Sequence, residues 1–210
     1  MLNPEKEHRI NAAQPSSQAG LRKSAQPLTF TFGVGGLRSA MRLECSRCAI
    51  RDWQPSDEAA LIAVANNRNV WRNLHHRFPH PYTQAAASFW FSLLAAMPEP
   101  THWAIEVNGV AVGGIGVDLG EGIFSKSGQF GYWLGEQYWG RGFMSEAVPA
   151  ASEYVLAHFR LARLEAPVFA WNPASMRVLD KAGFVREGVL RNSVLKDGQL
   201  IDQVLYALVR

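Results

Sequence analysis

The residues best suited to chemistry in this sequence form a glycine-containing turn, Gly140-Arg141-Gly142. Residues 128–134 before the turn have strand character, and residues 143–158 after it carry apolar residues at helical spacing. The first N–H groups of a helix have no partner within the helix and lie at the positive end of its dipole. Glycines at 140 and 142 let the backbone approach a ligand closely. The segment therefore predicts a site for a phosphate or pyrophosphate.

Two familiar phosphate-binding motifs do not fit this turn. A Walker loop needs a lysine after its last glycine, and Phe143 follows Gly142 instead. A dinucleotide fingerprint needs a third glycine at position 145, which is Ser145. On this segment alone a structural role stays open, in which the two glycines only permit a tight turn from strand to helix.

A second segment of interest begins where a predicted strand, residues 164–171, ends. Asn172 and Ser175 stand at the start of a predicted short helix, residues 174–182, and Gly183 is a typical helix-ending residue.

With these two segments the chain resembles the GCN5-related N-acetyltransferase (GNAT) family, in particular its branch of ribosomal-protein alanine N-acetyltransferases. The likeness covers roughly residues 41–210, and the motifs are specific because they occur in order and in the expected structural contexts. The residues that carry it are Gln137-x-x-Gly140-x-Gly142, Asn172-x-x-Ser175 and Lys181-Ala182-Gly183-Phe184, with Ile50-Arg51, Pro55 and Asp57 near the start and Asp197-Gly198, Asp202 and Tyr206 near the end.

The resemblance implies transfer of an acetyl group from acetyl-CoA, the cosubstrate, to an amine. It implies that the strands 128–134 and 164–171 are parallel and splay apart to admit the cofactor. Ser175 would lie near the leaving sulfur and donate a proton or hydrogen bond to it, although serine also suits a helix cap. The residues implied to bind the cofactor are Trp133, Leu134, Gln137, Trp139, Gly140, Arg141, Gly142, Phe143, Met144 and Asn172.

Two positions depart from the family pattern. Leu179 stands where many members have a tyrosine acid, and Gln129 stands where this branch often has an acidic residue as a candidate general base. An amide cannot take a proton at neutral pH, so the base stays open among water, Glu106, Asp118 and a histidine. Such a site suits an α-amine of pKa near ~7.8 better than a lysine near ~10.4, a handicap of roughly 3 pK units or about 4 kcal/mol.

Other groups of polar residues carry weaker expectations. Residues 68–82 are basic and aromatic, and they either recognise an acidic or aromatic acceptor or form an amphipathic surface segment. Their histidines lack a metal-ligand spacing with a carboxylate, and Cys45-x-x-Cys48 lacks a second ligand pair, so we expect no metal site. Residues 41–210 hold equal numbers of basic and acidic side chains, which argues against nucleic acid as a partner.

The predicted elements alternate between strands and helices. Asn108-Gly109 and Asp197-Gly198 are typical of tight β-hairpin turns, and Thr83 and the Pro55-Ser56-Asp57-Glu58 segment are typical of helix starts, with Ser56 as a hydroxyl cap. The strands are expected at 42–53, 102–107, 110–117, 128–134, 164–171, 184–195 and 200–209, and the helices at about 59–65, 83–96, 143–158 and 174–182.

Composition sets the remaining limits. The 210 residues are 48% hydrophobic and 19% charged, which predicts a folded core, and the longest apolar stretch, residues 85–97, is too short to cross a membrane. Residues 1–40 are rich in Gln, Ser, Ala, Pro and Gly, so we expect a disordered extension there and an N-acetyltransferase domain over 41–210. Two cysteines and no secretory segment favour a cytoplasmic location.

The sequence thus favours an α/β fold with a single mixed, mostly antiparallel sheet and helices on both faces, as the acyl-CoA N-acyltransferase fold has. The expected activity is direct acetyl transfer to a primary amine, either a protein N-terminal α-amine or a small-molecule amine. The alternative is a non-catalytic acyl-CoA sensor or regulatory module. The oligomeric state stays open, and a homodimer is one candidate.

Overall fold

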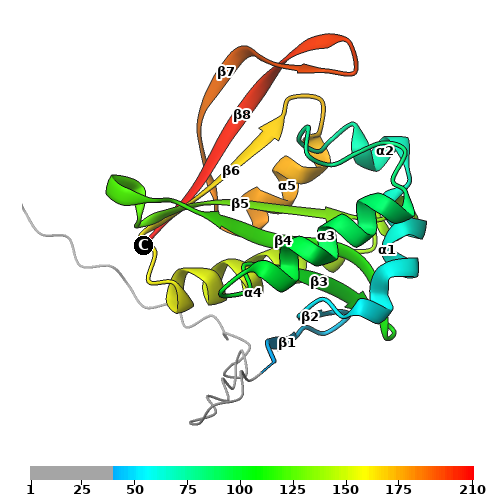
Figure 1. Cartoon of the computed structure of the whole chain (residues 1–210). Helices are drawn as coiled ribbons and strands as arrows, with labels where there is room; N and C mark the ends of the chain where they lie inside the picture. Colours follow the sequence, from blue (N-terminus) through cyan, green and yellow to red (C-terminus); the bar gives the residue numbers. More distant parts are fainter. Residues whose placement is uncertain (1–39) are drawn as a thin grey trace, which may run out of the picture. The chain divides into compact units, whose positions relative to one another are not determined.

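Segments rich in β-branched and aromatic residues form one eight-stranded sheet in residues 40–210, the part of the chain that the computed structural model describes (Figure 1). The order of strands is β1-β2-β3-β4-β5-β6-β8-β7. Their bounds are β1 Arg42–Glu44, β2 Ala49–Arg51, β3 His102–Val107, β4 Val110–Leu119, β5 Ser127–Leu134, β6 Arg163–Phe169, β7 Val185–Lys196 and β8 Gln199–Val209.

Helices pack on both faces of this sheet, as the sequence predicted. One apolar cluster joins the sheet to α4 and α5, and a second one, which includes Leu61, Ala87 and Trp133, lies under α1 and α3 on the other face. The helices are α1 Glu58–Ala65, α2 Arg68–Trp71, α3 Gln84–Ala96, α4 Phe143–His158 and α5 Pro173–Lys181.

Two predicted hairpins are confirmed at their turns. Asn108 and Gly109 have φ values of 51° and 80°, and Asp197 and Gly198 have φ values of 53° and 74°. Two successive residues of positive φ match the right-handed twist of the flanking strands. The β7–β8 hairpin extends beyond the rest of the sheet (Figure 1), and its turn is tied to α2 by an ion pair of 2.8 Å between Arg68 and Asp197.

The arrangement that positions the site is the parallel pair β5 and β6. These strands pair only at Ser127–Arg163, Gly128–Leu164 and Gln129–Glu165, after which β6 continues with β8 alone. Beyond Gln129 the two strands therefore diverge, and the backbone of β5 is left unpaired on that side. The predicted splay is confirmed.

Two local predictions are wrong. Residues 42–53 are not one strand but the hairpin β1–β2, in which the Cys45 N–H donates to the Cys48 carbonyl at 2.9 Å. The turn between Cys45 and Cys48 is short and interrupts the loose alternation of apolar and polar residues only briefly, so the alternation did not reveal it. The start of α1 is not capped by Ser56: Asp57 ends a 3-10 turn, η1 (Pro55–Asp57), and its carboxylate accepts the Gln54 N–H at 2.9 Å.

The proposed disordered extension, residues 1–40, lies outside the described residues except for Ala40. Within residues 40–210, each helix is too short or too polar to span a bilayer.

Candidate active site

The glycine turn lies between the end of β5 and the start of α4. A 3-10 turn, η3 (Glu136–Tyr138), leads into it. Gly140 has a φ of 73° and Gly142 a φ of 81°, a conformation that residues with a Cβ rarely adopt. Gly142 is the N-cap of α4, and no side chain caps this helix. The amino-terminal end of α4 is therefore free to receive an external acceptor.

Five consecutive backbone N–H groups, from Gly140 to Met144, make no hydrogen bond to another described residue. On one side of this run the Trp139 N–H donates to the Glu136 carbonyl at 3.0 Å, and on the other the Ser145 N–H donates to the Gly142 carbonyl at 3.1 Å. The amide of Trp139 is thus already used. Free amides at the positive end of a helix dipole are the kind of donors that favour an anion.

Arg47, in the turn between β1 and β2, contacts both the glycine turn and the first turn of α4. Its guanidinium donates to the Arg141 carbonyl at 2.9 Å and pairs with Glu146 in the first turn of α4 at 2.6 Å. A Cβ on Gly142 would lie 2.8 Å from a guanidinium nitrogen of Arg47, whereas a Cβ on Gly140 would meet nothing within 4 Å. The sequence gave no hint of this role, because Arg47 is 94 residues away from Arg141.

A cavity of about 320 Å³ lies between the carboxyl ends of the diverging strands. At its wall the Arg72 guanidinium stacks 4.6 Å over the ring of Trp171, and the Trp139 indole N–H donates to the Leu134 carbonyl at 2.7 Å. Leu134 is one of the residues expected to bind the cofactor, and its carbonyl oxygen keeps a second lone pair for another donor. The lining residues are Asn69, Arg72, Asn73, Glu136, Trp139, Trp171, Asn172, Pro173 and Ala174.

The second predicted segment brings Ser175 against a tyrosine of β5. Asn172 caps α5, because its side-chain oxygen accepts the Ser175 N–H at 3.1 Å. The alternative in which Ser175 is itself the cap is therefore wrong. Its hydroxyl oxygen lies 2.8 Å from the Tyr132 hydroxyl, which also donates to the Ser175 carbonyl at 3.1 Å. Burial raises the pKa of Tyr132, so this hydroxyl stays protonated at neutral pH and can act as a donor.

Comparison with known proteins decides the family. Residues 47–185 match a family model described as "Acetyltransferase (GNAT) domain". The chain is also 30% identical over 171 residues to the uncharacterized N-acetyltransferase YoaA of Bacillus subtilis (strain 168), which covers 80% of this chain and 96% of YoaA. The chain belongs to the GNAT family.

This GNAT domain has relatives in the ribosomal-protein branch. It is 37% identical over 78 residues to the [ribosomal protein uS5]-alanine N-acetyltransferase of Escherichia coli (strain K12), covering 37% of this chain and 40% of that protein. The solved structure of Mycobacterium smegmatis RimJ in complex with CoA-disulfide has the same fold, with a TM-score of 0.67 at 24% identity over 77% of this chain and 81% of that one.

Several other curated relatives match over less than half of their own length. One is the uncharacterized N-acetyltransferase p20 of Bacillus licheniformis, which is 38% identical over 82 residues, 39% of this chain and 46% of p20.

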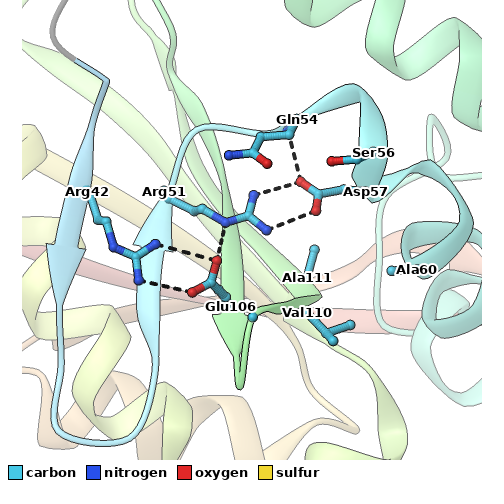
Figure 2. Close-up of a pocket in the computed structure, with 10 residues that line it drawn as sticks. Arg42, Arg51, Gln54, Ser56, Asp57, Ala60, Glu106, Val110 and Ala111 are labelled. Atoms are coloured by element: carbon cyan, nitrogen blue, oxygen red, sulfur yellow. Dashed lines mark hydrogen bonds and ion pairs between the residues drawn. The ribbon is translucent and has the colours of Figure 1, made fainter.

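In this GNAT domain Glu106, one of the candidate bases, is held in an ion-pair network on β3. Arg42 and Arg51 both pair with it, and Arg51 also binds Asp57 at 2.7 Å, as Figure 2 shows. Hydrogen bonds from the two guanidinium groups lower the pKa of Glu106, and Arg42 contributes more than Arg51. The network lines a separate cavity of about 380 Å³, which the glycine turn and Ser175 do not line. Glu106 is thus an ion-pair partner and is poorly suited to accept a proton.

The segment of residues 68–82 contains a helix that the sequence analysis missed. The side chain of Asn67 caps α2 by accepting the N–H groups of Asn69 and Val70. Its amide nitrogen donates to Glu136 at 2.7 Å, so the same residue links α2 to the loop after β5. The signal that could have predicted this helix was Asn67, a residue type that favours helix starts, followed by the short run of α2. Residues of α2 and the loop after it, among them Asn69 and Arg72, line the cavity between the splayed strands.

Proposed function

We propose that this chain is an acetyl-CoA-dependent N-acetyltransferase that acetylates a primary amine by direct transfer, with residues 41–210 as the transferase domain. The observation that carries the proposal is the run of free amides from Gly140 to Met144, next to strands that splay apart. A pyrophosphate needs such a set of donors, and an extended arm needs an unpaired strand edge.

The residues present fit coenzyme A. Gly140, Arg141, Gly142, Phe143 and Met144 would hold its pyrophosphate through their N–H groups, with Gln137 and Trp139 beside them. The backbone of Trp133 and Leu134 would pair with its pantetheine arm, and Asn172 would hold the loop beside it. When bound, acetyl-CoA supplies an acetyl group activated as a thioester.

The Ser175–Tyr132 pair would provide the proton for the departing thiolate. The two hydroxyl oxygens lie 2.8 Å apart, so the Tyr132 hydroxyl would turn from the Ser175 carbonyl to Ser175 Oγ and replace the proton that leaves it. Ser175 would thus act together with Tyr132 of β5, a residue that the sequence analysis did not single out.

The preferred acceptor would be an α-amine. Gln129 cannot accept a proton, and a lysine side chain pays about 4 kcal/mol more than an α-amine to become neutral near pH 7. The uS5-alanine acetyltransferase of Escherichia coli, which is named for an alanine acceptor, supports this choice.

Free-thiol release with two matched peptides would test the activity and the acceptor. One peptide has a free alanine amino terminus and no lysine, and the other has an acetylated amino terminus and one lysine. We expect turnover to be at least about 100-fold faster with the first, which is below the full pKa difference. Faster acetylation of the lysine peptide would contradict the acceptor. Tight coenzyme A binding without thiol release from either peptide or from spermidine would instead favour the sensor alternative.

Replacement of Ser175 by Ala should lower kcat about 10- to 100-fold, because proton transfer by a placed side chain contributes on this scale or somewhat above. Tyr132→Phe should have a similar effect, and the double variant should be little worse than either, since the two hydroxyls act as a unit. Steady-state kinetics with the alanine peptide and calorimetric titration with coenzyme A measure this. A large loss of coenzyme A affinity with unchanged kcat would show that Ser175 binds rather than donates.

A further inference from the structure

Three polar residues lie on one face of the sheet where the pairing of β5 with β6 ends. In the register of β4 and β5, Asp118 is opposite Gln129 and Gly116 is opposite Gly131, while His102 of β3 is opposite Gly116. Opposed residues of paired strands point to the same face, and so do residues two apart on one strand. Asp118, His102 and Gln129 therefore share a face with Trp133, whose ring packs in the apolar cluster of α1 and α3.

The partners of Asp118 distinguish it from Glu106. One oxygen of Asp118 lies 3.6 Å from Nε2 of His102, and the other lies 3.2 Å from the Arg77 guanidinium. Its side chain is 51% exposed, whereas that of Glu106 is 15% exposed and pairs with two arginines. Asp118 is thus a carboxylate that a solvent-borne acceptor can reach.

His102 has two neighbours that hold its ring in place. Its Nδ1 lies 2.9 Å from the Thr101 hydroxyl, and the Trp90 ring packs edge-on against it at 5.5 Å. A Cβ on Gly116 would lie 2.6 Å from the imidazole, so the glycine makes room for this ring. Burial lowers the pKa of His102, so the ring is neutral near pH 7 and lies beside the Asp118 carboxylate without neutralising its charge.

Asp118 lies opposite Gln129, the last residue of β5 that pairs with β6, so it stands where the opening between the two strands begins. Tyr132 and Ser175 mark the proposed place of the sulfur, and they lie on the other face of the sheet from Asp118, because Tyr132 alternates with Gly131 and Trp133 along β5. The sulfur would therefore leave toward one face while the acceptor approaches from the other. A Cβ on Gly131 would meet nothing within 4 Å, so the face that Asp118 shares has open space there. Asp118 and Gly131 are diagonal neighbours, about 7–8 Å apart between Cα atoms in such ladders. An amine that occupied the open space at Gly131 would therefore lie within reach of the Asp118 carboxylate, directly or through one water molecule.

We propose that Asp118 accepts the proton of the acceptor ammonium and that His102 positions its carboxylate, in place of the acid absent at Gln129. This assignment rests on the proposed function. In the step, the ammonium gives one proton to Asp118, and the neutral nitrogen then bonds to the acyl carbon as the carbon–sulfur bond breaks. The sulfur takes its proton from the Ser175–Tyr132 pair, and the second nitrogen proton leaves to solvent.

The charged and titratable groups around Asp118 come from two elements. Arg77 and His75 face it from the loop between α2 and α3, and His102 faces it from β3. Its neighbour on β5 is the uncharged Gln129. Burial and Arg77 lower the pKa of His75. Asp118 is therefore the acidic side chain among these neighbours, and its replacement by Asn removes the negative charge that they contribute to the site.

The test uses the alanine peptide and acetyl-CoA with the full chain. Asp118→Asn should lower the rate about 100-fold at pH 7, within the range for general base catalysis. The deficit should shrink below about 10-fold at pH 9.5, because an α-amine above its pKa of ~7.8 needs no base. A second substitution, Gln129→Glu, should restore most of the rate, since it returns a carboxylate to the same face one strand away.

His102→Gln should cause a smaller loss, about 10-fold, and should add little to Asp118→Asn if the two act as a unit. Glu99→Gln is the matched control, because Glu99 forms an exposed carboxylate–histidine pair with His158 at 2.7 Å and lies outside the site. It should leave the rate unchanged, and all variants should keep wild-type affinity for coenzyme A.

A near-wild-type rate for Asp118→Asn at pH 7 would overturn the assignment, and so would a loss that is equal at every pH and is not rescued by Gln129→Glu. A wild-type chain that binds coenzyme A but releases no thiol with any amine would contradict the proposed function and this assignment together. The two failures are therefore distinguishable.

Discussion

Replacing Gly142 by Val should weaken coenzyme A binding about 1,000-fold in a calorimetric titration. Gly142 has a φ of 81°, and a Cβ there would lie 2.8 Å from the Arg47 guanidinium. The substitution therefore strains the turn through its positive φ and displaces the Arg47 guanidinium that contacts it, and both changes re-aim the amides at the start of α4. Two lost charge-assisted hydrogen bonds of about 1.5–3 kcal/mol each correspond to about 3–6 kcal/mol, or roughly 100- to 10,000-fold in affinity.

Gly109→Val is the matched control for the backbone strain. Gly109 has a φ of 80°, and a Cβ on it would meet nothing within 4 Å, but it lies in the β3–β4 hairpin turn. This variant should lose some stability and keep its affinity for coenzyme A. Gly140→Ala, which has strain without a clash, should fall between the two. Wild-type affinity in Gly142→Val would remove the main support for the proposed cofactor site.

The second large effect concerns stability. Asp57→Asn should lower the free energy of unfolding by about 3 kcal/mol, the lower end of the range for breaking a buried ion pair. The side chains of Arg51 and Asp57 are both 8% exposed and are joined by two hydrogen bonds, at 2.7 and 2.9 Å (Figure 2). The variant leaves Arg51 with Glu106 as its remaining anionic partner. For a domain of this size the expected fall in Tm is about 6–12 °C.

Urea unfolding followed by circular dichroism would measure this change. Glu153→Gln makes the same carboxylate-to-amide change at an exposed ion pair with Arg210, 3.6 Å apart, and should change stability by less than about 0.5 kcal/mol. Equal effects of the two substitutions would show that the Arg51–Asp57 pair is not a stabilising contact.

The same network should make the domain sensitive to acid. Arg42 and Arg51 lower the pKa of Glu106 in the folded state. A carboxylate with a depressed folded pKa contributes stability that is fully present above its unfolded pKa of ~4.3. That contribution is lost as the pH falls through the lowered value. Glu106→Gln should therefore flatten the decline in stability below about pH 4.5 in acid titrations.

Local patterns determined most of the elements. Asn108-Gly109 and Asp197-Gly198 fixed two hairpins, because a pair of positive-φ residues allows few other conformations. Thr83 marked the start of α3, where its side chain accepts the Ala86 N–H. The β1–β2 hairpin and α2 escaped detection, since three- and four-residue elements are too short for hydrophobic periodicity to stand out.

For the candidate site, the sequence by itself determined the two segments on which the proposed function rests, the glycine turn and the Asn172–Ser175 start of α5. Both are local, because a helix start depends on a few successive residues and the amides they leave free. Only the tertiary structure decided their partners: Arg47 under the turn, Tyr132 against Ser175, and Asp118 opposite Gln129. It also removed Glu106 from the candidate bases by surrounding it with Arg42 and Arg51. These contacts join residues far apart in the chain, and strand order and register, which no local pattern encodes, set which of them meet.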